Sequence, residues 1–177
     1  MHIAIVSMKA RHKRHPRSRQ RALADIAEEQ ASQAACLVGQ QVRLSRTHSR
    51  GVSGAAISTT ATCLGLDIEF EDEQRDWPGI LGLFSPRLRK MPALMPDLVR
   101  TWTFLEAYYK AVGRYPEAGY VEAVAEPVTP SGSVLPLGGN MFLYHKVLTG
   151  GAHLSVVWCG EGRAPVILPE QVLDSVD

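Results

Sequence analysis

Apolar positions along the chain predict several short strands. Residues 2–7 form an apolar run, and Val42 and Leu44 alternate with polar neighbours as in a half-buried strand. The β-like runs in the first half of the chain are residues 2–7, 41–46, 53–59 and 62–70. Those in the second half are residues 120–125, 141–148 and 153–159. The turn over 149–152 predicts a hairpin between the last two, whereas residues 127–139 are rich in Pro, Gly and Ser and predict an irregular loop.

Helical periodicity appears twice. The first predicted helix covers about residues 18–36, with Ser18 as its N-cap. The second runs from Pro96 or Asp97 to Gly113, which is a suitable stop. Its apolar positions recur at steps of three and four residues: Leu98, Trp102, Leu105, Tyr109 and Val112.

This pattern predicts an α+β protein in which an antiparallel-rich sheet packs with two main helices. The chain has 177 residues, of which 45% are hydrophobic and 21% charged, a composition typical of a folded globular domain. No apolar run approaches the roughly 18 residues of a membrane span, and the apolar run at the N-terminus is too short for a secretory signal. We therefore expect a single domain over 1–177 and no membrane partner.

The three cysteines, Cys36, Cys63 and Cys159, are odd in number and widely spaced. They form no CxxC pair, so they indicate neither a disulfide framework nor a zinc site. Such cysteine usage is typical of a reducing compartment, and we expect a cytoplasmic protein.

The formal net charge of +1 hides an asymmetry. Residues 1–21 carry seven cations, all within the basic segment 9–21, and no acid, whereas the remainder has 12 basic and 18 acidic residues, a balance of −6. A basic segment of this kind fits phosphate groups, nucleic acid or an acidic protein as partner. It has no interleaved aromatic residue, which argues against nucleic acid as the partner.

Two carboxylates share one face of the predicted strand over 62–70. Asp67 and Glu69 are two residues apart, so both project away from Leu66 and Ile68. Paired carboxylates repel each other unless a cation or proton lies between them, and hard oxygen ligands suit Mg²⁺. The alternative is an edge strand whose solvated face is acidic.

The second helix carries Trp102, Glu106 and Lys110 at successive four-residue steps, which places them on one stripe. Glu106 and Lys110 are candidates for a site at this helix. Considered alone, the pair also fits an ordinary surface ion pair.

The segment 44–51 combines His48 with hydroxyl side chains, two arginines and a glycine, a mixture suited to holding phosphate. Ser49 and His48 are adjacent, but there is no GxSxG elbow, so a catalytic triad is weakly supported. A solvated loop histidine is the alternative.

In this order, the three segments resemble the motifs of the 4′-phosphopantetheinyl transferase superfamily. Its pattern is G-[VIL]-D-[VIL]-E on a strand, followed some 40 residues later by W-[ST]-x-x-E-[AS]-x-x-K on a helix. Residues 65–69 match the first part at every position, and residues 102–110 match the second, with a sequence separation of 39 from Asp67 to Glu106. Thr47-His48-Ser49 is similar to the Ser-His-Ser segment of the longer, surfactin-synthetase-activating type.

The resemblance implies a phosphopantetheinyl transferase-like fold with a reduced N-terminal half-repeat. Residues 1–40 would be the reduced part, and residues 41–177 the part that bears the motifs. It also implies a reaction in which the 4′-phosphopantetheine arm of coenzyme A is transferred to a serine of an acyl or peptidyl carrier protein, releasing 3′,5′-ADP.

Residue roles follow from the same resemblance. Asp67, Glu69 and Glu106 would hold Mg²⁺, and Glu106 would also be the base. Lys110 would contact coenzyme A and stabilise the departing nucleotide. His48, with Thr47 beside it, would contact the 3′-phosphate of coenzyme A.

The chain departs from the family at several places, among them the Gly-Lys-Pro segment, where Gly39-Gln40-Gln41 stands. Leu105 stands where lysine is common, Thr47 replaces serine, and only 47 residues precede His48. Leu105 and the short N-terminal part motivate the alternative of a catalytically inactive module of the same fold that binds a carrier protein or coenzyme A.

Overall fold

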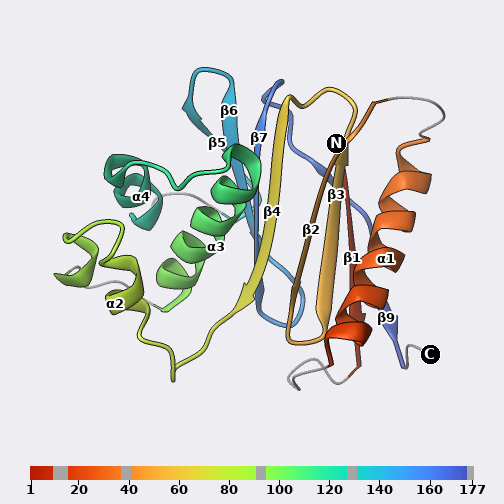
Figure 1. Ribbon diagram of the computed structural model, residues 1–177, viewed down its shortest axis with the longest axis horizontal. Helices are drawn as coiled ribbons and strands as arrows, with labels where there is room; N and C mark the ends of the chain where they lie inside the picture. The colour runs from red at the N-terminus through yellow and green to blue at the C-terminus, as the bar shows by residue number, and fades with distance from the viewer. Residues whose placement is uncertain (10–15, 37–40, 91–94, 127–130, 175–177) are drawn as a thin grey trace.

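The computed structural model describes residues 1–9, 16–36, 41–90, 95–126 and 131–174. Two β-sheets pack face to face, and a long helix lies on the outer side of each (Figure 1). Helix α1 (Arg17–Ala34) covers one sheet and α3 (Met95–Val112) the other.

The first sheet combines strands from both ends of the chain. Its path is β2-β3-β1-β8, with β9 also paired to β1. Strands β1, β2 and β3 are antiparallel, whereas β8 and β9 run parallel to β1. The bounds are β1 His2–Met8, β2 Arg43–Ser49, β3 Val52–Ser58, β8 Val166–Ile167 and β9 Gln171–Leu173.

The second sheet is antiparallel throughout, in the order β4-β7-β6-β5. Its strands are β4 Cys63–Phe70, β5 Val134–Gly138, β6 Met141–Val147 and β7 Ala152–Cys159. Three short helices lie beside α3 or lead into it: α2 Trp77–Leu81, η1 Leu88–Lys90 and α4 Ala118–Ala125.

Alternation along the strands creates the layers. In β1, Ile3 and Ile5 enter the core between the sheets, whereas Ala4 and Val6 pack against α1. In β4, the even-numbered residues from Leu64 to Phe70 enter the same inter-sheet core. Gly65, Asp67 and Glu69 therefore lie on the opposite face, which α3 covers. The two-residue spacing predicted the shared face of Asp67 and Glu69 but not the helix that covers it.

The two sheets are built from units of similar topology. In the first unit, β1 is followed by α1, β2 and β3, and the last strand pairs with β1. In the second unit, β4 is followed by α3 and then β5, β6 and β7, and the last strand pairs with β4. In both units the last strand pairs on its other side with the strand before it, β2 in the first unit and β6 in the second. The connection pattern therefore repeats.

Several predicted elements are confirmed. The helix predicted to end at Gly113 does so: Gly113 has φ +81° and donates its amide to the Tyr109 carbonyl. The first helix and the strands around both motifs form with shifted bounds, and the turn over 149–152 joins β6 and β7. No described helix is long and apolar enough to cross a membrane.

Other predictions are wrong. Residues 118–125 form helix α4 rather than a strand, and part of the predicted loop forms edge strand β5, while residues 127–130 lie outside the described chain. Ser18 does not cap the first helix, whose N-cap position is Pro16. The β-rich part is two sheets rather than one.

The cysteine prediction is also wrong. Cys63 and Cys159 face each other in the β4–β7 register and form a disulfide, leaving Cys36 free and exposed. Because 96 residues separate the pair in sequence, no spacing rule could connect them. Only the strand register brings them together.

Candidate functional site

The edge strands of the two sheets meet through side-chain hydroxyls rather than through a backbone ladder. Ser45 accepts a hydrogen bond from the Leu66 amide at 2.9 Å. Thr47 donates to Asp67 Oδ1 at 3.0 Å, and Ser49 donates to Glu69 Oε2 at 2.8 Å. Ser45, Thr47 and Ser49, which share one face of β2, therefore contact β4 and place the segment around His48 beside the Asp67–Glu69 face.

Asp67 is buried, with 6% of its surface exposed. Its Oδ1 also accepts from Lys110 Nζ at 2.8 Å, whereas Oδ2 is buried and has no hydrogen-bond partner. Loss of solvent raises the pKa of Asp67 to about 6, and the attraction of Lys110 only partly opposes this rise. The free oxygen of a desolvated carboxylate is a position where a cation would be stabilised.

Lys110 extends from the last turn of α3 to β4. Besides Asp67, its ammonium donates to the Leu66 carbonyl at 3.0 Å. Among the described ion pairs, Lys110 is paired with Asp67 and not with Glu106. The alternative of a surface ion pair within the helix is therefore wrong. Lys110 instead links the second motif to the first.

Glu69 has two partners of its own. It accepts the Ser49 hydrogen bond through Oε2, and its Oε1 lies 3.5 Å from Arg75 Nη1. Arg75 follows β4 in the acidic segment 71–76 and lies over the rings of Trp77 and Trp102. Sequence reasoning missed Arg75, because no motif includes it.

Glu106 lies on the same helical stripe as Lys110, one turn earlier. Its Oε1 accepts a hydrogen bond from the Tyr115 hydroxyl at 3.0 Å. Burial, followed by the Glu106 contact, raises the pKa of Tyr115, so the phenol remains a donor. Tyr115 lies beyond the end of the helix, and its ring stacks on that of Tyr109. No pattern in the sequence predicts this contact.

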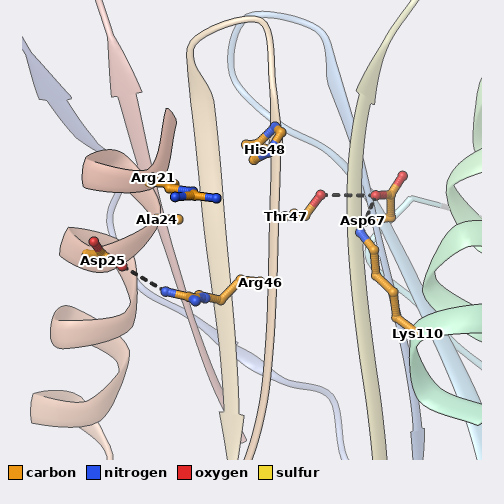
Figure 2. A pocket seen from close by; sticks show the side chains of 8 residues that line it. All are labelled: Arg21, Ala24, Asp25, Arg46, Thr47, His48, Asp67 and Lys110. Atoms are coloured by element: carbon orange, nitrogen blue, oxygen red, sulfur yellow. Dashed lines mark hydrogen bonds and ion pairs between the residues drawn. The ribbon is translucent and has the colours of Figure 1, made fainter. Parts of the chain in front are cut away.

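A pocket of about 640 Å³ opens between α1, the edge strands and the end of α3 (Figure 2). It brings together Thr47, His48, Asp67 and Lys110 from three separate segments. The full lining is Arg21, Ala24, Asp25, Arg46, Thr47, His48, Asp67 and Lys110.

The α1 side of this pocket is rich in charge. Arg46 is held by Asp25 at 2.7 Å and Glu28 at 3.1 Å, whereas Arg21 points toward the cavity beside His48 (Figure 2). Arg21 is the last cation of the basic segment 9–21, of which residues 10–15 lie outside the described chain. At the other end, Lys9 pairs with Asp174.

Further polar side chains lie next to Asp67 on the same face of the second sheet. Ser155, which pairs with Asp67 in the ladder, contacts the Thr103 hydroxyl at 2.8 Å and His145 Nδ1 at 3.1 Å. Burial, and then the neighbouring His153, lower the pKa of His145 to about 3. Thr103 of the second motif thus fastens α3 to the sheet.

Part of the donor set fits the Mg²⁺ that the resemblance implies. Asp67 and Glu69 project from one face, and Asp67 Oδ2 is a buried oxygen with no partner. Glu106 is on the facing helix, but its carboxylate is turned to Tyr115. Within the described part of the chain, no three acidic, His or Cys side chains converge as one metal-holding group.

Comparison with known proteins adds no family. No family model matches the chain, and no curated protein matches it. Functional interpretation therefore rests on the motifs and on the geometry of the pocket.

Proposed function

We propose that this protein is a 4′-phosphopantetheinyl transferase. The observation that carries the proposal is the pocket in which Thr47 and His48 lie with Asp67 and Lys110. These residues come from three segments that resemble the family's motifs, and no spacing along the chain requires them to meet.

In the proposed reaction, a serine hydroxyl of an acyl or peptidyl carrier protein attacks the phosphorus of coenzyme A that bears the pantetheine arm. A new phosphorus–oxygen bond to serine forms, and the bond to 3′,5′-ADP breaks. Such transfer depends mainly on positioning and on stabilising phosphate charge.

Asp67, Glu69 and Glu106 are the residues that would hold Mg²⁺ in this proposal. When bound, the ion supplies positive charge to the diphosphate oxygens. Asp67 Oδ2 has no hydrogen-bond partner to give up, but it is buried, so neighbouring side chains would have to open a path for the ion. To bind the ion, the Glu106 carboxylate would have to leave the Tyr115 hydroxyl and turn toward Asp67 and Glu69.

Glu106 is also the proposed base for the serine proton, directly or through water. Lys110 is the proposed cation for the departing nucleotide, since its ammonium already lies at the Asp67 carboxylate. His48, Thr47 and Arg21 line the part of the pocket where the 3′-phosphate of coenzyme A would bind.

The proposed substrates suggest a cytoplasmic location, where coenzyme A is available. The Cys63–Cys159 disulfide removes the cysteine argument for a reducing compartment. Cytoplasmic location thus depends on the proposed activity alone.

One observation favours a second candidate, a non-catalytic module that binds a carrier protein or coenzyme A. Each of the three carboxylates has a protein partner: Lys110 for Asp67, Arg75 for Glu69, and Tyr115 for Glu106. Such partners would let the acidic face remain stable without a metal. Binding of coenzyme A without any transfer would identify this function.

The test of the first proposal is incubation of the protein with coenzyme A, Mg²⁺ and a panel of apo-carrier proteins. Intact-mass measurement should show a carrier that has gained one phosphopantetheine arm. Absence of transfer to every carrier, from a folded sample that binds coenzyme A, would contradict the proposal.

Glu106→Gln tests the proposed base and ligand. Glutamine keeps the size of the side chain and an oxygen that can accept from Tyr115, so the fold should be unchanged by circular dichroism. Transfer should fall by about a hundredfold or more, because both the base and a charged ligand are lost. Glu161→Gln, an exposed acid beyond β7, is the matched control and should retain full turnover.

A further inference from the structure

Arg75 lies between the acidic face of β4 and two indole rings. Its guanidinium carbon is 4.4 Å from the centroid of the Trp77 ring and 5.0 Å from that of Trp102. Its Nη1 is 3.5 Å from Glu69 Oε1. Because a planar guanidinium stacks on aromatic faces, the two rings fix its orientation.

The segment that carries Arg75 is itself held in place. The Asp72 carbonyl accepts from the Arg75 amide at 3.1 Å and from Trp77 Nε1 at 2.9 Å. The Asp72 carboxylate accepts from the Gln74 amide and pairs with Arg50 at the β2–β3 turn. Arg75 is therefore placed by its backbone as well as by its side-chain contacts.

The ion pair with Glu69 occupies few of the N–H donors of Arg75. A guanidinium has five N–H donors, and a strong charge-assisted hydrogen bond to a carboxylate is about 2.7–2.9 Å long. The Glu69 contact at 3.5 Å is longer, and no other carboxylate among the described residues is paired with Arg75. The side chain is 35% exposed, so solvent and ligands can reach its donors.

Among the described ion pairs, neither Arg100 nor Lys110 of helix α3 is paired with Glu69. Arg100 instead pairs with Asp97 and donates to the Val124 carbonyl. Leu105 is fully buried and packs in the cluster that includes Trp77 and Leu81. The Lys110 ammonium lies at Asp67, two residues before Glu69 on β4. Arg75 thus supplies the positive charge next to Glu69.

We propose that Arg75 binds the diphosphate of coenzyme A through two parallel N–H···O contacts, beside Glu69 and opposite the Lys110 end of the site. This inference rests on the proposed function, since coenzyme A is its substrate. It assigns to Arg75 a binding role that no residue of the two motifs supplies at this position.

The first measurement is calorimetric affinity for coenzyme A and for inorganic pyrophosphate, both with Mg²⁺ at a fixed concentration. Arg75→Gln should weaken both by about tenfold or more, because the charge-assisted contacts of the guanidinium are lost. Arg75→Lys keeps the charge without the planar fork and should show a smaller loss. Arg89→Gln, an exposed cation in η1, is the matched control and should bind within twofold of the wild type.

The second measurement reports the contact itself. The chain has three tryptophans, of which Trp77 and Trp102 lie under Arg75 and Trp158 stacks on Phe142. Pyrophosphate should therefore change tryptophan emission of the wild type, and Arg75→Gln should abolish the change while its melting curve shows a folded protein. A merely structural Arg75 would produce no ligand-dependent emission.

Affinity within twofold of the wild type for Arg75→Gln would overturn the inference, as would a wild type that binds neither probe. Transfer activity that is indifferent to Arg75→Gln would reject Arg75 while leaving the proposed function intact. Arg75-dependent binding of coenzyme A without transfer to any carrier would support Arg75 and reject the transferase.

Discussion

At the scale of single residues, Asp67 is the position where burial and function conflict. Its carboxylate faces α3, where Lys110 offsets only part of the cost of losing water. A buried carboxylate with one free oxygen stores an unfavourable interaction that a bound cation or proton would relieve. A ligand that completes the site would offset this cost of burying the Asp67 carboxylate.

The raised pKa of Asp67 predicts that the free energy of unfolding depends on pH. The folded-state pKa of about 6 exceeds the usual 3.8, so the folded protein binds the proton more tightly than the unfolded chain. The contribution of Asp67 to stability is fully present below about pH 4 and is lost as pH rises through 6, by roughly 3 kcal/mol in total.

Asp67→Asn isolates this contribution. The free energy of unfolding of the variant minus that of the wild type should increase between pH 3 and pH 8, in the presence of a chelator. Taking the difference removes the opposite contribution of His145, whose lowered pKa destabilises the fold as pH falls. Denaturant titrations at each pH measure it, and a difference that does not vary with pH would contradict burial as the cause.

At the scale of elements, the contact between α3 and β4 depends on Gly65. A Cβ at Gly65 would lie 1.9 Å from the Ala107 carbonyl oxygen and 2.7 Å from the Ala111 amide nitrogen. Both atoms belong to helix backbone, which cannot give way as a flexible side chain can. The glycine of the first motif is therefore required for the close approach that lets Lys110 reach Asp67.

Gly65→Ala should destabilise the protein by about 3 kcal/mol or more, at the upper end of the cost of overpacking. Moving α3 away from β4 should also weaken the Lys110–Asp67 pair. Thermal and denaturant unfolding measure the effect. Gly119→Ala, where nothing lies within 4 Å of the added Cβ, is the control and should be neutral or slightly stabilising. Equal unfolding midpoints for Gly65→Ala and the wild type would contradict this account.

The sequence predicted the elements with strong periodicity and missed those without it. Helix α3 and strand β4 have apolar residues at regular steps, so their faces and the stripe of Glu106 and Lys110 followed directly. Helix α4 was mistaken for a strand because Tyr120, Val121 and Val124 favour strands locally. Val121 and Val124 are buried at helical spacing, so tertiary packing decides its structure.

The candidate site was predictable in its parts but not in its connections. Alternation placed Asp67 and Glu69 on one face, and the motif identified Lys110. The partners Arg75, Tyr115 and Arg21 depend on how loops and α1 pack against the two sheets. Such contacts are long-range and leave no periodic signal.

At the scale of the whole molecule, two units of similar connection share one inter-sheet core. Side chains of β1 and β3 meet those of β4 and β7 there, while β2 and β4 join the two sheets at one edge through hydroxyls. The site lies at that edge, so it forms only when both units have folded. Stability of the second sheet therefore affects the site directly.

The Cys63–Cys159 disulfide contributes to that stability. It joins strands that already pair over eight residues, so its removal should leave the native ladder intact. Its main effect is on the unfolded chain, in which it closes a loop across a separation of 96 residues. By the chain-entropy argument, such a loop stabilises the fold by about 3–5 kcal/mol.

We therefore expect reductant, or replacement of both Cys63 and Cys159 by serine, to lower the free energy of unfolding by about 3–5 kcal/mol. The denaturant slope should rise, because the unfolded chain becomes more expanded. Cys36→Ser should change neither quantity, since that thiol is exposed and free. Thiol titration of the unreduced protein should find a single reactive cysteine. Three reactive thiols, or a midpoint indifferent to reductant, would show that the strands hold together without the covalent link.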